Sequence, residues 1–438
     1  PKYKSLLGVK TTRGGTKSAG TVNKTKTKTK TKTAGTTSGG SLKSGGSLKS
    51  GGFVSAGSVD SYENNIDKVM KFIESDPMLL LHLLEMMDNM SDVDPIYKPG
   101  NYWKFYEKKI IKQILSNKLD QFRNWNGGAG TGSIHSFGGG EMELQRSFNY
   151  YFHPFEAKFK KIDNNFLVKI YNSLINKISR YLNFFSYFAI RSSLARKIFF
   201  DKIKSEFETK YDLIKLINPK LLTAKDSRLG EPIGFEKDKK FYTNYFLNIL
   251  IEYQHIKKNL KKNDIKNVVE VGAGTGMLAN IFLQLNKKSK YFILDIPPTL
   301  FIAEYNLRNL GYSVYGFKEL KAGKKDFKKY DVILLPTWKL DFLNNIKFDL
   351  FINIASFQEM EKQQSLLYLN FFKKQTKYIF LKNAINGHSR TKDEGKFGVI
   401  NPTRMMDCEK VLKRTHRIIS KEIFNYNKNY RLLLKNNT

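Results

Sequence analysis

Cysteine is nearly absent from this 438-residue chain, since Cys408 is the single one. That count excludes an intrachain disulfide, a disulfide-stapled secreted fold and a zinc site built from several cysteines. Long apolar runs are missing as well. The most apolar stretch, 78–87, is interrupted by His82 and Glu85 and is far shorter than the ~20 residues that a membrane span requires. We therefore expect a cytoplasmic protein in a reducing compartment, with no transmembrane segment.

Acidic residues are scarce: 40 Asp and Glu stand against 75 Lys and Arg, a formal net charge of +35. Hydrophobic residues at 41% and aromatic residues at 13% are enough to build a folded core, which excludes a wholly disordered or fibrous chain. A positive surplus of this size predicts contact with a polyanion such as nucleic acid or an anionic membrane.

The surplus is concentrated at the start of the chain, where residues 1–59 hold 12 basic side chains and no acidic one. Segment 1–58 consists mostly of Gly, Ser, Thr and Lys, and it repeats Ser-Gly-Gly-Ser-Leu-Lys from Ser38 and from Ser44. So little apolar area cannot offset the entropy of ordering, which predicts a disordered basic tail. Two functions stay open for it: a solubilising tether, or contact with nucleic acid, including association with a virion if the source is a large virus.

The region 59–263 is predicted to be mainly helical, with apolar residues at three- and four-residue spacing. A glycine-rich segment, 127–140, interrupts it as a connector or a lid, and 229–234 forms a tight turn. Helices are expected to start at Asp60 or Ser61 and at Pro77, and to cover 102–119, 166–191 and 239–260.

The region 264–438 alternates short apolar strands with helices, which is typical of an α/β fold with a parallel sheet covered on both faces. A Rossmann-like sheet is therefore expected here. The segment 313–317 is either a short strand or an irregular stretch of chain before the strand at 331–335. The predicted strands are 268–271, 291–295, 331–335, 350–354 and 377–381, and the predicted helices are 276–285, 300–310 and 365–372.

Three alternating glycines, Gly272, Gly274 and Gly276, follow the first of these strands and open a helix. Glycine lets the backbone turn tightly and approach a bound ligand closely. Asp295 ends the next strand, where an acidic side chain can accept hydrogen bonds from ribose hydroxyls. Together these features predict a site for a nucleoside cofactor. A dinucleotide site would instead show Gly-x-Gly-x-x-Gly spacing.

With Glu270 two residues upstream, the glycine motif resembles motif I of the class I S-adenosylmethionine-dependent methyltransferases. The segments 291–300 and 348–360 look like those of a family of proposed sugar O-methyltransferases. This similarity is clearest over 268–386, with 97–103 and 122–125 as weaker candidates. The resemblance implies an O-methyltransferase that uses S-adenosylmethionine and acts on a sugar or glycan, with the helical region covering the acceptor side. The cofactor-binding residues that we expect are Glu270, Gly272, Gly274, Gly276, Asp295, Ile296 and Asn353.

Transfer to a hydroxyl requires an aligned acceptor oxygen and a group that removes its proton. Glu359, just past a strand's carboxyl end, is one candidate base, although a carboxylate there also suits a helix start. His388, in a loop, is the other candidate, because histidine titrates in the useful range. The candidate acceptor-binding residues are Ser356, Trp338, Asn383 and Arg390. Asn353 and Asn383 could bind either the cofactor or the acceptor. Trp338 could equally belong to the hydrophobic core.

We expect no metal site, because none of the six histidines pairs with another at helical spacing. A magnesium ion bound by carboxylates that lie far apart in the sequence stays open as an alternative. Two other functions compete with sugar methylation: a nucleic-acid (RNA) methyltransferase, suggested by the charge, and a virion or scaffold protein that binds nucleic acid through its basic tail. The sequence lacks the Asn/Asp-Pro-Pro-Tyr-type motif of amino-directed nucleic-acid methyltransferases.

Overall fold

The computed structural model describes residues 77–115, 119–123, 193–260, 265–324, 326–388, 390–425 and 428–437. All of them belong to one compact unit. The tail 1–58, the helix expected from Asp60 or Ser61, the helix expected at 166–191 and the glycine-rich segment 127–140 lie outside the described residues. The domain boundaries at 58/59 and 263/264, and the polyanion contact of the tail, stay predictions.

A central sheet of eight strands organises the described residues, in the order β5-β6-β4-β3-β7-β8-β10-β9. The strands are β3 (Asn267–Val271), β4 (Lys290–Asp295), β5 (Val314–Tyr315), β6 (Val332–Pro336), β7 (Phe348–Ile354), β8 (Thr376–Ala384), β9 (His416–Phe424) and β10 (Asn429–Asn436). The helices along it are α9 (Met277–Leu285), α10 (Pro297–Asn309), α11 (Phe317–Lys321), α12 (Lys362–Phe372) and α13 (Met405–Leu412).

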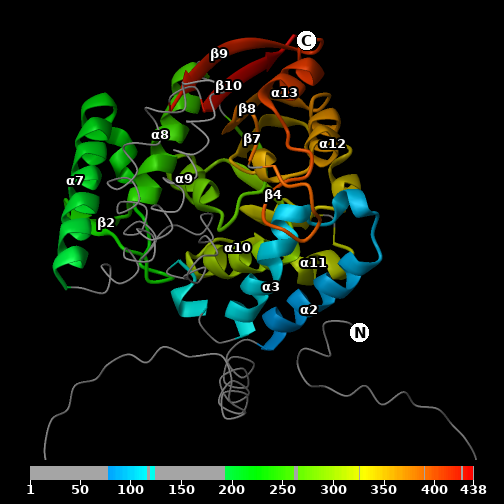
Figure 1. Cartoon of the computed structure of the whole chain (residues 1–438), viewed down its shortest axis with the longest axis horizontal. Helices are drawn as coiled ribbons and strands as arrows, with labels where there is room; N and C mark the ends of the chain where they lie inside the picture. Colours follow the sequence, from blue (N-terminus) through cyan, green and yellow to red (C-terminus); the bar gives the residue numbers. More distant parts are fainter. Residues whose placement is uncertain are drawn as a thin grey trace, which may run out of the picture. The chain divides into compact units, whose positions relative to one another are not determined.

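The predicted strands pair in parallel, β6 with β4, β4 with β3, β3 with β7 and β7 with β8. Their residues are apolar on both faces because helices cover both faces. Right-handed crossovers that run outward in opposite directions from β3 and β7 place α9 and α12 on opposite faces. Figure 1 shows α9 on one side of the strands and α12 with α13 on the other. The ambiguous segment 313–317 contains β5 and the start of α11.

The end of the sheet differs from the expected parallel arrangement. Strand β10 pairs antiparallel with both β8 and β9, and neither β9 nor β10 was predicted. The short connection from Phe424 to Asn429 explains the direction, because only antiparallel strands can be joined by a hairpin. Most residues of β9 are exposed, and the strand carries the charged residues Arg417, Lys421 and Glu422. It therefore lacks the apolar pattern from which the inner strands were predicted.

The helical region contributes α2 (Pro77–Ser91), α3 (Asn101–Leu115), α7 (Ser193–Ile217) and α8 (Asn244–Asn259), with single turns η2 (Pro95–Tyr97), η3 (Leu119–Gln121) and η5 (Pro219–Thr223). The helix expected at 239–260 begins later than predicted, because 235–242 form a hairpin of β1 (Phe235–Lys237) and β2 (Lys240–Tyr242). Thr243 then caps α8, its hydroxyl accepting the Phe246 N–H at 3.0 Å.

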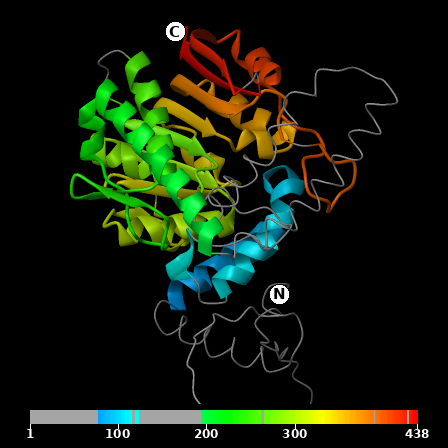
Figure 2. The ribbon, with the colours of Figure 1, turned by 60° about the vertical axis from the view of Figure 1, so that its left-hand side comes forward.

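Helix α3 is tied to the segment that follows β8, almost 300 residues further along the chain. The Asn101 amide group donates to the carbonyls of Lys396 and Gly398 at 2.7 and 2.9 Å, and its oxygen accepts the Gly395 N–H at 2.7 Å. In Figure 2 the cyan helix lies beside this orange segment. The helical region therefore packs directly on the sheet region at this point.

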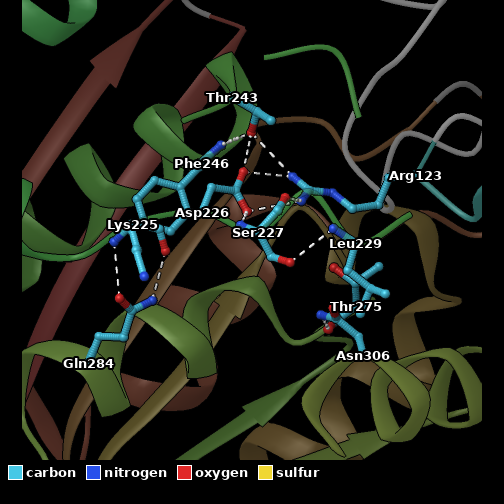
Figure 3. Close-up of polar contacts among 10 residues, drawn as sticks. All are labelled: Arg123, Lys225, Asp226, Ser227, Leu229, Thr243, Phe246, Thr275, Gln284 and Asn306. Atoms are coloured by element: carbon cyan, nitrogen blue, oxygen red, sulfur yellow. Dashed lines mark hydrogen bonds and ion pairs between the residues drawn. The ribbon is translucent and has the colours of Figure 1, made fainter. Parts of the chain in front are cut away.

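A buried ion pair joins the turn after η3 to the segment that follows η5. The two terminal nitrogens of Arg123 donate to the two oxygens of Asp226 at 2.9 and 2.8 Å, and both side chains are 1% exposed. The Thr243 hydroxyl donates to the same carboxylate at 2.6 Å (Figure 3). A buried charge without a partner would be costly, so Arg123 and Asp226 stay paired. Because Thr243 both bonds to this pair and caps α8, the network fixes where α8 begins.

The strand order reverses between β3 and β7, because the chain runs from β3 to β4 on one side and continues from β7 to β8 on the other. In open α/β sheets ligands bind in the crevice outside the carboxyl ends of strands at such a switch point. Among the described helices, none is long and apolar enough to cross a bilayer.

Candidate active site

A cavity of about 520 Å³ opens at the switch point. Its walls come from the turn after β3, the carboxyl ends of β4 and β7, the η2–α3 segment, and α8 with β8 and β10. Its volume is in the range of small-molecule and cofactor sites. The predicted residues that line it are Glu270, Gly272, Gly274, Asp295, Ile296, Ser356 and Glu359.

The glycine turn needs its glycines for conformation and for space. Gly272 and Gly276 both have a φ of +76°, in the left-handed region that favours glycine. A methyl group on Gly272 would lie 1.9 Å from Ser356 Oγ, and one on Gly276 would lie 2.9 Å from Leu307. Gly272 therefore packs against the turn after β7, whereas Gly276 lets α9 approach α10 and does not line the cavity.

Asp295 ends β4 and holds the glycine turn. Its carboxylate oxygens accept the Gly274 N–H at 3.1 Å and the Ile296 N–H at 2.8 Å. Burial raises the pKa of Asp295 to about 6, although hydrogen bonds from the Thr299 side chain and from these two backbone groups oppose the rise. A carboxylate has about four lone-pair positions, and these three donors use three of them, so Asp295 can stiffen the turn and still accept one hydrogen bond from a ligand in the cavity.

Glu270 is buried on β3 and accepts the Tyr291 hydroxyl at 2.8 Å. Burial raises the pKa of Glu270 to about 8; the Tyr291 hydrogen bond opposes this rise and the charge of Asp295 adds to it. Because two buried carboxyl groups face one cavity, an anionic ligand beside them is disfavoured and a cationic ligand is favoured.

Glu359 ends η7 (Phe357–Glu359), the turn that follows β7. It accepts hydrogen bonds from the Tyr102 hydroxyl and the Trp103 indole, both at the start of α3. Burial raises the pKa of Glu359 to about 8, Tyr102 and Trp103 lower it, and the charge of Asp295 raises it further. A carboxyl group that is oriented by two donors and has a pKa in this range suits general-base catalysis.

Asn353 and Asn383 do not line the cavity, contrary to our expectation of ligand contact. The Asn353 amide group donates to the Val271 carbonyl at 2.8 Å, and its oxygen accepts the Phe357 N–H and the Asn383 amide, each at 3.0 Å. The Asn383 oxygen accepts the Gln358 N–H at 3.2 Å. Both amides are buried and hydrogen-bonded to the chain itself, so they hold the turn that carries Glu359 in place.

Trp338, His388 and Arg390 also lie away from the cavity lining. Trp338 is partly buried in the turn after β6. Arg390 is exposed, and its Nε donates to the Ile400 carbonyl at 3.2 Å. The ring of His388 packs 4.7 Å from that of Tyr102, and burial lowers the pKa of His388. His388 therefore supports the aromatic side chain that contacts Glu359, and loop position alone did not indicate this.

Sequence reasoning missed a charged cluster that lines the cavity from α8, β8 and β10. Glu252 of α8 is 2% exposed and accepts Lys382 Nζ at 2.7 Å together with Arg431 Nε and Nη2 at 2.7 and 2.6 Å. Burial alone would raise the pKa of Glu252, but Arg431 and Lys382 hold it below its usual value. Arg431 lies on β10, a strand that was not predicted although Leu432 to Leu434 form a short buried apolar run there.

Comparison with known proteins finds no matching family model and no matching curated protein. Solved structures do match. An S-adenosylmethionine-dependent methyltransferase from Clostridium acetobutylicum has 14% identity and a TM-score of 0.30, with 44% of this chain and 90% of that chain covered. Magnesium protoporphyrin IX methyltransferase from Synechocystis, solved with bound S-adenosylhomocysteine, has 13% identity and a TM-score of 0.31, with 44% and 83% covered.

An O-methyltransferase from neocarzinostatin biosynthesis, solved with S-adenosylhomocysteine and a dihydroxynaphthoic acid, has 11% identity and a TM-score of 0.31. The match covers 44% of this chain and 56% of that one, so the chain spans little more than half of that enzyme. What the cavity of this protein can bind follows from its own residues.

Proposed function

We propose that this protein is a class I S-adenosylmethionine-dependent methyltransferase that methylates a hydroxyl group of a sugar or glycan. One observation carries the proposal: a single cavity joins the glycine turn and Asp295 to Glu359. The first two features suit a nucleoside cofactor, and the third suits removal of a proton from a hydroxyl.

The residues present fit S-adenosylmethionine better than a dinucleotide. Glu270 and Asp295 are buried carboxyl groups with raised pKa values, and both face the cavity. A cationic sulfonium and ammonium would restore their ionised forms, whereas a pyrophosphate would place more negative charge beside them. Gly272 and Gly274 would let the backbone contact the cofactor, and Asp295 would accept its ribose hydroxyls.

When bound, this cofactor supplies an activated methyl group to an acceptor oxygen. The chain's own contribution is orientation and proton transfer. Glu359 takes the proton of the acceptor hydroxyl, and Tyr102 and Trp103 hold its carboxylate in a fixed direction. Asn353 positions Glu359 through the turn after β7 without contacting a ligand.

A hydroxylated acceptor fits the rest of the lining, which mixes aromatic and polar side chains. Tyr97, Trp103 and Tyr245 offer ring faces and hydrogen-bonding groups, and Asn248 offers an amide, whereas the Gln364 amide already donates to the Ile96 and Lys98 carbonyls. The sequence resemblance to proposed sugar O-methyltransferases points to the same class of acceptor.

The first test is cofactor binding measured by calorimetry. Asp295→Ala should weaken S-adenosylmethionine binding by about tenfold or more, because a buried acceptor of hydrogen bonds is lost. Asp349→Ala is the matched control: Asp349 also accepts two backbone N–H groups, from Lys266 and Asn267, but at the opposite edge of the sheet. A wild-type protein without measurable affinity for the cofactor would refute the proposal.

The second test identifies the acceptor. Transfer of a radiolabelled methyl group should be followed with neutral and acidic sugars, glycans and RNA in parallel. Labelled sugar hydroxyls are the expected result. Exclusive labelling of RNA would instead support a nucleic-acid methyltransferase, for which the net charge of +35 is the motivating observation.

A further inference from the structure

The charges that line the cavity are separated along the sheet. Glu270, Asp295 and Glu359 lie near the glycine turn, at the carboxyl ends of β3, β4 and β7. The cations Lys382 and Arg431 lie on β8 and β10, whereas a third cation of the lining, Lys98, lies between η2 and α3 and donates to the Ser91 carbonyl at 2.8 Å. Four strand spacings separate β4 from β10, which is ~19 Å at about 4.8 Å per spacing. The cavity therefore has an acidic end and a cationic end.

The cationic end has more positive than negative charge in its lining. Lys382 and Arg431 lie opposite each other in the β8–β10 register, and Glu252 is the carboxylate that pairs with both. Arg431 also donates to Glu422 at 3.1 Å, but the Glu422 side chain is 46% exposed and solvent screens its charge. Arg431 packs over the Phe424 ring at 4.3 Å, which fixes its direction.

These cations have donors beyond those that Glu252 uses. An ammonium has three N–H groups, of which Glu252 takes one from Lys382. The guanidinium of Arg431 has five, of which the described contacts with Glu252 and Glu422 take three. Both side chains are partly buried, at 25% and 18% exposure, so a hydrogen bond from them to an anion would be only partly screened.

We propose that Lys382 and Arg431 form an acceptor subsite that binds an anionic group, a carboxylate or a phosphate, on the sugar whose hydroxyl is methylated. This inference rests on the proposed function, because the glycine turn and Asp295 assign the other end of the cavity to the cofactor. The acceptor would then lie with its reacting hydroxyl near Glu359 and its anion between β8 and β10. The substrate class is a uronic acid or a sugar phosphate, not a neutral sugar.

The test compares D-glucose, D-glucuronate and D-glucose 6-phosphate, titrated into the full chain saturated with S-adenosylhomocysteine. At least one anionic sugar should bind about tenfold or more tightly than glucose, and the two anions together distinguish carboxylate from phosphate. Added salt should weaken the anion and leave glucose unchanged. Equal binding of all three sugars, or no anion binding, would overturn the subsite.

Two variants assign the effect to the cluster. Lys382→Gln should cut the affinity for the anionic sugar about tenfold, since a charged hydrogen bond is lost while Arg431 still holds Glu252. Lys377→Gln is the matched control: it makes the same change on the same strand at an exposed position outside the cavity lining. Thermal unfolding checks that both variants fold, and Arg431→Lys, which keeps the charge, should retain part of the preference.

The same variants separate this inference from the proposed function. Lys382→Gln should leave the affinity for S-adenosylmethionine unchanged. If it weakens cofactor binding instead, these cations bind the carboxylate of the cofactor and the acceptor subsite is wrong. If the wild-type protein binds anionic sugars but no S-adenosylmethionine, the proposed function fails while the anion site stands.

Discussion

The backbone at Gly272 packs so closely against Ser356 that a methyl group on Gly272 would lie 1.9 Å from the Ser356 oxygen. Gly272 follows β3 and Ser356 follows β7, the two strands that meet at the switch point. The turn that suits the cofactor and the turn that carries Glu359 therefore pack directly against each other. A substitution in one of these turns should therefore alter the position of the other turn.

Gly272→Ala tests this contact. We expect it to cost more than the roughly 1–2 kcal/mol of left-handed backbone strain, because Ser356 must also move, and to lower cofactor affinity. Gly311→Ala is the control, since Gly311 has a φ of +87° with open space around it. Urea unfolding measures both costs. Adding Ser356→Gly to Gly272→Ala should recover part of the loss, and equal costs for Gly272→Ala and Gly311→Ala would contradict the steric argument.

The pH dependence of methyl transfer identifies the base. A general base acts when deprotonated, so with Glu359 in this role kcat should rise with pH up to about 8, the raised pKa of Glu359. Glu359→Gln should lower kcat by about 100- to 10,000-fold with little change in cofactor affinity. With His388 as the base, the rise would instead end below pH 6.5, because burial lowers the pKa of His388.

The neighbours of Glu359 provide the controls for that profile. Tyr102→Phe removes a hydrogen bond that lowers the pKa of Glu359, so the rise in kcat should move to higher pH. Tyr253→Phe also removes a buried tyrosine hydroxyl, but Tyr253 packs against Phe282 and should leave the profile in place. A profile that does not move in Tyr102→Phe would count against Glu359 as the base.

Much of the parallel sheet could be predicted because its strands are apolar on both faces, as at Val332 to Leu335. The glycine turn and Asp295 were found from spacing alone, since their chemistry is local in sequence. Asn353 and Asn383 ended strands as predicted, but their amides bond to each other and to the backbone. Sequence position places a side chain at an edge of the sheet without telling which way it points.

The parts that escaped prediction depend on contacts between distant segments. Trp103 reaches Glu359 across more than 250 residues, and Arg431 reaches Glu252 across 179. Neither contact leaves a periodic pattern in the sequence. The strand that carries Arg431 has only a short apolar run, Leu432 to Leu434, and its partner β9 is polar and exposed, so this pair of strands lacks the longer apolar pattern of the inner strands.

Glu270 should make the empty protein less stable as pH rises. Its folded pKa is about 8, whereas an unfolded glutamate titrates near 4.3, so between these values the folded state holds a proton that the unfolded state has released. The stabilisation is complete below about pH 4.3 and is lost as pH rises through 8. Compared with Glu270→Gln, the wild type should lose on the order of 3 kcal/mol between pH 5 and pH 8.

Urea unfolding at several pH values, without cofactor, measures this difference. Glu206→Gln, at an exposed position on α7, is the control and should follow the wild type. A bound cation near Glu270 should flatten the slope, because it favours the ionised carboxylate in the folded state. Parallel curves for the wild type and Glu270→Gln would mean that Glu270 is ionised in the folded protein at neutral pH.

The buried pair of Arg123 and Asp226 should dominate the stability of the helical region. Asp226→Asn leaves the Arg123 charge without a buried counter-charge, which typically costs about 3–5 kcal/mol. Glu236→Gln breaks the pair of Arg228 and Glu236, whose side chains are 66% and 67% exposed, and should cost below about 1 kcal/mol. Urea unfolding at pH 7 compares the two changes.

The same substitution connects stability to the cationic end of the cavity, where Lys382 and Arg431 lie. The Asp226 carboxylate accepts the Thr243 hydroxyl that caps α8, and α8 carries Glu252 to Lys382 and Arg431. Asp226→Asn should therefore weaken binding of anionic sugars more than binding of S-adenosylmethionine, whose predicted contacts lie on β3 and β4. Equal losses for both ligands would show that the variant perturbs the whole cavity, and no loss of stability would show that the pair is not needed to fix α8.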